Sequence, residues 1–232
     1  MDIAYADVDG VWLDGLDFCS RVYRLHERLM QRPNVTTRLR LRPTAFEKKL
    51  IEELQPLCRY IQTYYGPGRH LSVRWSSGNQ SWDAEYLQRG AIIDHCNLPR
   101  SGYIEITTAM HANAHLQRER LESHGFAYGL DGLSRGGSKR KGKPIESVPV
   151  VMNDASTIAA MAALIIRSID DKAGRYPDNA SLIVECTLNT LYEEHHWQDL
   201  LASIADALPE HGFNGIFLCS ASCGLIGAIG RP

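Results

Sequence analysis

Apolar residues recur along this 232-residue chain at helical spacing in some segments and at strand spacing in others. Helical spacing predicts helices over residues 15–32, 44–65, 111–124, 156–172 and 197–208. Alternating or continuous apolar runs predict strands over residues 70–76, 81–88, 90–96, 102–108, 181–187 and 215–220. This order predicts an α/β (α+β) fold, in which helices flank a mixed β-sheet.

Local signals define several of these elements more closely. Thr44 as N-cap and Glu47 three residues later form a capping-box pattern, and Pro56 should kink the helix that follows. Turn compositions between residues 70 and 108 predict an antiparallel meander or a long bulged hairpin. The strand–helix–strand order from residue 181 to 220 predicts parallel pairing through a crossover helix. Asp154 or Ser156 is expected to cap the alanine-rich helix.

The predicted organisation is an N-terminal extension with a basic helix over residues 1–43 and one α/β domain over residues 44–232. Residues 134–146 should form a mobile basic loop, because glycines and like charges are concentrated there. The longest apolar stretch, residues 158–166, is too short to span a membrane, and the acidic start does not resemble a signal peptide. Six cysteines at unrelated spacings fit reduced thiols. We therefore expect a soluble cytoplasmic protein without a membrane partner.

Basic residues are unevenly distributed, although the net charge is only −2. Residues 21–43 contain seven arginines and one acid, and residues 135–143 contain five basic residues and no acid. Such segregation suits a surface that binds phosphates, or equally a solvated helix face and a disordered loop. On the first reading the nucleic-acid contacts come from Arg21, Arg24, Arg28, Arg118, Arg135, Lys139, Arg140, Lys141 and Lys143.

Glu105 is the most informative acid, because it lies between two isoleucines in the strand predicted over residues 102–108. Side chains alternate along a strand, so Glu105 shares a face with Tyr103 and Thr107. An acid in such a setting is unfavourable unless a metal, a cation or water compensates its charge. The two readings are a site for a cation and a solvated sheet face.

The succession of a helix bearing an acid, a meander with an aspartate, the Glu-x-Thr strand and a further helix resembles the PD-(D/E)XK nuclease superfamily over residues 44–125. The resemblance implies a restriction-endonuclease-like core. It also implies Mg²⁺ or Mn²⁺ held by carboxylates, and hydrolysis of phosphodiester bonds. Hard oxygen ligands suit Mg²⁺, which activates water and neutralises phosphate charge.

The resemblance places Glu105 at the glutamate of the motif and leaves two candidates for the aspartate. Asp83 lies in a Trp-Asp-Ala setting closer to the motif, whereas Asp94 would face Glu105 if residues 91–108 formed a simple hairpin. Glu47 is the first choice for the helix acid and Glu53 the second.

Thr107 occupies the position where the motif has lysine. A hydroxyl can orient water but cannot supply a cation, so His111, His115 or Arg118 of the following helix should supply the base or the cation.

His111 and His115 also suggest a zinc site, because histidines four residues apart on one helix face can chelate a metal, with His95 or Asp94 as a third ligand.

Glu105, the basic segments and the resemblance together predict a metal-dependent nuclease that acts on DNA in preference to RNA, with homodimerisation left open. Two alternatives are an inactive nuclease-fold protein that binds nucleic acid or a protein in a regulatory or defence role, and a Zn²⁺-dependent hydrolase.

Overall fold

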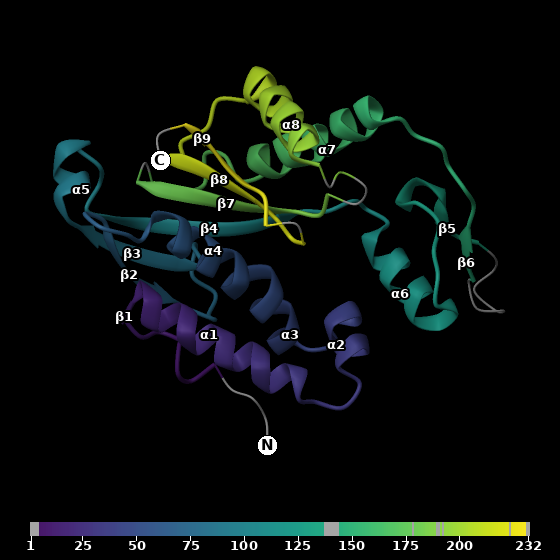
Figure 1. Ribbon diagram of the computed structural model, residues 1–232, viewed down its shortest axis with the longest axis horizontal. Helices are drawn as coiled ribbons and strands as arrows, with labels where there is room; N and C mark the ends of the chain where they lie inside the picture. The colour runs from purple at the N-terminus through teal and green to yellow at the C-terminus, as the bar shows by residue number, and fades with distance from the viewer. Residues whose placement is uncertain are drawn as a thin grey trace.

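The computed structural model describes residues 5–136, 144–177, 179–188, 191, 193–222 and 224–230 (Figure 1). Within them, seven strands form one mixed sheet in the order β1-β2-β3-β4-β7-β8-β9. The strands are β1 (Leu13–Asp14), β2 (His70–Trp75), β3 (Ala84–Arg89), β4 (Ser101–Ala109), β7 (Ala180–Cys186), β8 (Gly215–Ser220) and β9 (Ile226–Gly230). The first four pair antiparallel, β4, β7 and β8 pair parallel, and β9 is antiparallel to β8. The predicted mixed sheet flanked by helices is confirmed.

Helices cover both faces of this sheet (Figure 1). One face carries α1 (Gly15–Met30), α3 (Ala45–Lys49), a π-helical turn η1 (Leu50–Leu54) and α4 (Gln55–Tyr64). The other face carries α7 (Asp154–Asp170) and α8 (Glu194–Ala207). Each face of the sheet has its own hydrophobic core, because side chains alternate along the strands. Ile183 packs into the core beneath α1 and α4, whereas its neighbours Leu182 and Val184 pack into the core beneath α7 and α8.

The α1 helix lies within the segment that the sequence analysis sets apart as residues 1–43. Its apolar face, which includes Phe18, Val22 and Leu25, belongs to the same core as Leu57 of α4 and Val73 of β2. Burial of such side chains contributes about 1.5–3 kcal/mol each. This helix is therefore held by tertiary packing against the sheet.

The expected kink near Pro56 takes the form of the π turn η1. Proline has no N–H and its ring crowds the carbonyl four residues earlier, so the regular α-helical ladder cannot pass through this position. The N–H of Gln55 instead bonds to the carbonyl of Leu50, five residues back. Glu52 and Glu53 are adjacent in this turn but have different partners. Glu52 pairs with Arg42, whereas Glu53 pairs with Lys49.

The remaining described elements are α2 (Val35–Leu41), α5 (Ala91–His95), α6 (Ala114–His124), the 3₁₀ turn η2 (Leu130–Gly132), and a hairpin of β5 (Leu133–Arg135) and β6 (Ile145–Ser147). The α6 helix, η2 and the hairpin share a small core at one end of the molecule (Figure 1). Residues 137–143 of the predicted basic loop, including Lys139, Arg140, Lys141 and Lys143, lie outside the described residues.

Two local predictions were wrong. Residues 90–96, predicted as a strand, form the helix α5, because Gly90 leaves the strand with φ 126° and its carbonyl accepts from the N–H of Ile93 and Asp94. Asn153, and not Asp154 or Ser156, caps α7 by accepting from the Ser156 N–H at 2.8 Å.

Candidate active site

The structure brings Asp83 and Glu105 together at the place where β3 begins beside β4. Asp83 immediately precedes β3, and its N–H donates to the carbonyl of Ile104 at 3.0 Å. Its Oδ2 atom accepts from the N–H of Ile106 at 2.8 Å. Asp83 thus bonds to both residues that flank Glu105 and satisfies a strand N–H that β3 no longer reaches.

Burial and charge repulsion both act on Asp83. Burial, followed by the charge of Glu105, raises the pKa of Asp83 from 3.8 to about 7. Glu53 of η1 adds to the repulsion, while the Ile106 N–H and Lys172 oppose it. A carboxyl group held in this way gains from any cation that binds beside it.

Glu105 itself is buried and forms an ion pair with Lys172, which follows α7. The hydroxyl of Tyr176 also hydrogen-bonds Glu105; burial, and then this bond, raises the pKa of Tyr176. Lys172 is therefore a cation beside Glu105, whereas the resemblance expects the cation two residues after the glutamate. Thr107 lies on β4 at that motif position and shares the face of Glu105.

Of the two candidates for the helix acid, Glu53 lies near this pair. Its Oε2 atom accepts from Nε1 of Trp75 at 3.1 Å and lies 3.7 Å from the Lys49 ammonium group. Burial raises the pKa of Glu53, partly offset by Lys49.

Glu47, the first choice, is engaged elsewhere. It completes the capping box with Thr44 and forms an ion pair with Arg38. Burial acts to raise its pKa, but the bonds from Thr44, its own amide and Arg38 hold the pKa below its usual value.

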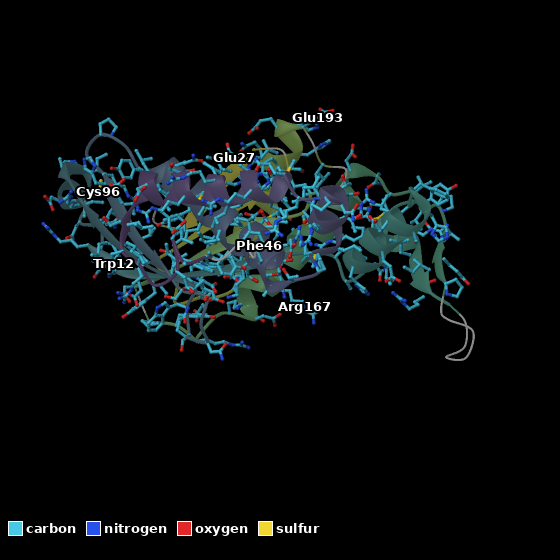
Figure 2. All side chains as sticks on the ribbon, turned by 90° about the horizontal axis from the view of Figure 1, so that it is seen from below. Trp12, Glu27, Phe46, Cys96, Arg167 and Glu193 are labelled. Atoms are coloured by element: carbon cyan, nitrogen blue, oxygen red, sulfur yellow. The ribbon has the colours of Figure 1, made fainter. Side chains whose placement is uncertain are left out.

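We expect Glu47→Ala to lower the free energy of unfolding by about 1–2 kcal/mol, because it removes the cap of α3 and the partner of Arg38. Urea denaturation measures this loss, with Glu27→Ala on the exposed face of α1 as the control (Figure 2). Equal stability of the two variants would contradict the structural role of Glu47.

A simple hairpin over residues 91–108 would have placed Asp94 opposite Glu105, and this prediction is wrong. Asp94 lies in α5 and forms an exposed ion pair with Arg100 at 2.6 Å. The α5 helix and the neighbouring Cys96 are at the opposite end of the molecule from α6 (Figures 1 and 2). Residue 94 is therefore separated both from Glu105 and from the histidines at the start of α6.

The predicted helical pair of histidines does not form, because α6 begins only at Ala114. His111 precedes the helix; its Nδ1 atom accepts from the Asn113 N–H at 3.1 Å, and its Nε2 atom lies 3.3 Å from Asp131. His115 is exposed and bonds to the carbonyl of Ala112. Along β4, Ala109 is already about 13 Å beyond Glu105, so His111 does not reach the carboxylate pair.

The described residues contain no group of three or more histidine, cysteine or acidic side chains that could hold a metal ion. The pair of Asp83 and Glu105 nevertheless suits Mg²⁺ or Mn²⁺, because Mg²⁺ is commonly bound through one or two carboxylates with the remaining ligands from water and substrate phosphate. Zn²⁺ favours three or four nitrogen, sulfur or carboxylate ligands, which the described residues do not supply.

The arginine-rich segments are largely compensated in space. Arg21 pairs with Asp17 at 2.8 Å, Arg40 with Glu122 at 2.9 Å, and Arg135 with Glu119. Arg24 and Arg28 are exposed on α1, and Arg118 is half-buried on α6. The charge separation seen along the sequence is thus reduced by ion pairs, some within one helix and others between separate elements.

Sequence reasoning missed Lys172 and Tyr176, and it ranked Glu53 second.

None of the helices that the structure describes combines the length and the apolar composition of a membrane-spanning helix. Comparisons with protein-family models, with curated proteins and with solved structures find no match for this chain.

Proposed function

We propose that the chain hydrolyses phosphodiester bonds of nucleic acid with Mg²⁺ or Mn²⁺ at the pair formed by Asp83 and Glu105. The observation that carries the proposal is the burial of Asp83 beside Glu105: burial, and then the charge of Glu105, raises the pKa of Asp83 to about 7. Two carboxylates held together in a largely buried place are stabilised by a divalent cation. The resemblance to PD-(D/E)XK nucleases in residue order supports the same chemistry.

In this proposal, the residues of the chain have distinct roles. Asp83 and Glu105 hold the metal ion, which when bound acidifies water and stabilises charge on the phosphate. Lys172 neutralises Glu105 in the metal-free chain and would offer its ammonium group to a phosphate oxygen if the carboxylate held a metal ion. Thr107 lies on the face of Glu105, where its hydroxyl orients water. Tyr176 fixes the Glu105 carboxylate through its hydroxyl.

The test is incubation of the purified chain with plasmid, single-stranded DNA and RNA, each with Mg²⁺, with Mn²⁺ and with a chelator. We expect cleavage only with a divalent cation, and DNA to be preferred. Absence of cleavage of all three substrates under every metal condition would overturn the proposal.

A second candidate is a nuclease-fold protein that binds nucleic acid without cleaving it. The ion pair between Lys172 and Glu105 favours it, because a protein cation already compensates the carboxylate. Titration calorimetry with Mg²⁺ and Mn²⁺ separates the two. Salt-sensitive DNA binding without metal binding would select this second function.

Lys172→Met is expected to change metal binding and catalysis in opposite directions. Without the competing ammonium group, Glu105 should bind Mg²⁺ more tightly, while the cleavage rate at saturating Mg²⁺ should fall by about 10²-fold. Calorimetry and single-turnover cleavage measure the two effects, with Lys48→Met on the exposed face of α3 as the control. An unchanged cleavage rate would show that Lys172 only neutralises Glu105.

A further inference from the structure

A second charged cluster lies at the C-terminal end of β7, on the sheet face covered by α4. Its centre is Glu185, which is buried and interacts electrostatically with Arg59, Arg42, Glu52 and Arg118. These side chains come from β7, α4, the end of α2, η1 and α6. We call Arg42, Arg59 and Arg118, together with Glu52 and Glu185, the arginine cluster.

Two of the three arginines have carboxylate partners. The Arg59 guanidinium lies 3.5 Å from Glu185 and also donates to the carbonyls of Ser220 and Ala221. Arg42 donates to Glu52 at 2.6 Å. Both arginines are mostly buried, with exposed side-chain fractions of 27% and 17%.

Arg118 has no carboxylate partner within 4.0 Å among the described residues; its guanidinium donates to Sδ of Met110 at 2.8 Å. A thioether is a weak acceptor and carries no charge. Burial, and then repulsion from Arg42, lowers the pKa of Arg118, while Glu52 and Glu185 oppose the shift. Its positive charge is thus incompletely compensated.

The negative charge of the cluster is also incomplete. Burial raises the pKa of Glu185 to about 7, even though Arg59 and Arg42 act to lower it. Near neutral pH, Glu185 is therefore only partly ionised, so it compensates the surrounding guanidinium groups incompletely. Positive charge exceeds negative charge in a place with little access to water.

Arg42 carries a further sign of an incomplete site: its Nε atom is buried without a hydrogen-bond partner among the described residues. Its left-handed backbone, with φ 49°, belongs to the end of α2, where the N–H of Arg42 donates to the carbonyl of Arg38.

We propose that the arginine cluster binds a phosphate group through Arg118 and the unpartnered edge of Arg42, with Arg59 beside them. Guanidinium groups bind phosphate oxygens through paired, charge-assisted hydrogen bonds. Such a ligand would compensate Arg118 and satisfy Nε of Arg42. This site is separate from the pair formed by Asp83 and Glu105, and the inference does not depend on the proposed nuclease activity.

A larger phosphate compound would need space beyond the cluster itself. A cleft of about 530 Å³ is lined mainly by residues 127–131 and by Val150, Met152 and Thr157. Its lining includes Gln117 and Thr187, which are close in sequence to Arg118 and Glu185. The phosphate could therefore be free in solution or part of a nucleic-acid backbone, and the test separates these sources.

The experiment is titration calorimetry of the full chain with inorganic phosphate, and separately with a short single-stranded oligonucleotide. Arg118→Gln is expected to weaken phosphate binding about tenfold, as loss of one charge-assisted bond implies. The control is Arg167→Gln, an exposed arginine of α7 labelled in Figure 2, which should bind as the wild type does. Arg42→Gly is a second variant, because glycine accepts the left-handed backbone and removes the same kind of group.

Weakening of both titrations in Arg118→Gln would assign the site to a nucleic-acid backbone phosphate, and weakening of phosphate binding alone would assign it to a free phosphate compound. The inference would be overturned if the wild type bound no phosphate saturably, or if Arg118→Gln and Arg42→Gly both bound phosphate with wild-type affinity. Glu105→Gln should bind phosphate as the wild type does. Phosphate binding by the arginine cluster can therefore be established even if the chain cleaves no nucleic acid.

Discussion

Glu105→Gln is expected to reduce metal-dependent cleavage of nucleic acid by at least about 10²–10³-fold and to abolish the heat of Mg²⁺ binding. The amide keeps the shape of the side chain and can still accept from Lys172 and Tyr176, so the fold should be retained. It cannot supply the negative charge that a hard cation requires. The loss of activity would therefore arise from the missing carboxylate.

The control for this variant is Glu85→Gln on the neighbouring strand β3. Glu85 pairs with Arg74 and is half-buried, so the substitution removes a comparable carboxylate outside the pair. Cleavage and Mg²⁺ binding should remain close to those of the wild type. Activity that survived in Glu105→Gln but disappeared in Glu85→Gln would place the catalytic carboxylate on β3 and contradict the assignment of Glu105.

The sequence predicted the strand of Glu105 and the meander around it, but it could not decide which aspartate lies beside Glu105. Strand periodicity reports which face a residue occupies and excludes a one-residue slip, but it does not choose between registers that differ by two residues. In the structure Ala84 pairs with Ile104, and Gly90, with its left-handed backbone, lies between the end of β3 and the start of α5. This turn carries Asp94 away and leaves Asp83 beside β4.

The cation could not be found from spacing, because Lys172 lies 67 residues from Glu105. Topology explains the contact: α7 crosses over between β4 and β7, and β7 pairs parallel with β4 from Tyr103 and Ala180 onward. Residues shortly before Ala180 must therefore approach the beginning of β4. The sequence predicted the parallel pairing of β7 with β8, but it did not predict that β4 is the other neighbour of β7.

The basic segments show a similar limit of sequence reasoning. Seven arginines over residues 21–43 suited a phosphate-binding surface or, equally, a solvated helix face. Folding instead places Arg40 beside Glu122 and Arg42 beside Glu52, so local composition overstates the exposed positive charge. The incompletely compensated charge around Arg118 arises from three distant elements, and no single segment reveals it.

Asp83→Asn is expected to stabilise the fold above pH 7 while it removes Mg²⁺ binding. In the unfolded chain Asp83 ionises near pH 3.8, whereas in the folded chain it ionises near pH 7. Between these values folding takes up a proton, so the stability contribution of Asp83 falls as pH rises and stays low above pH 7. The shift corresponds to roughly 4 kcal/mol, which solvent screening reduces to about 1–3 kcal/mol.

Asparagine avoids this loss, because its amide oxygen can still accept from the Ile106 N–H and carries no charge. Urea denaturation at pH 8 and near pH 4 measures the effect: the advantage of the variant should be largest at pH 8 and should disappear near pH 4. Glu185 also has a raised pKa, but it is present in both proteins and cancels in the comparison. Saturating Mg²⁺ should stabilise only the wild type. A variant less stable than the wild type at pH 8 would show that Asp83 contributes to the fold as an anion, and the electrostatic conflict proposed for the pair would then be wrong.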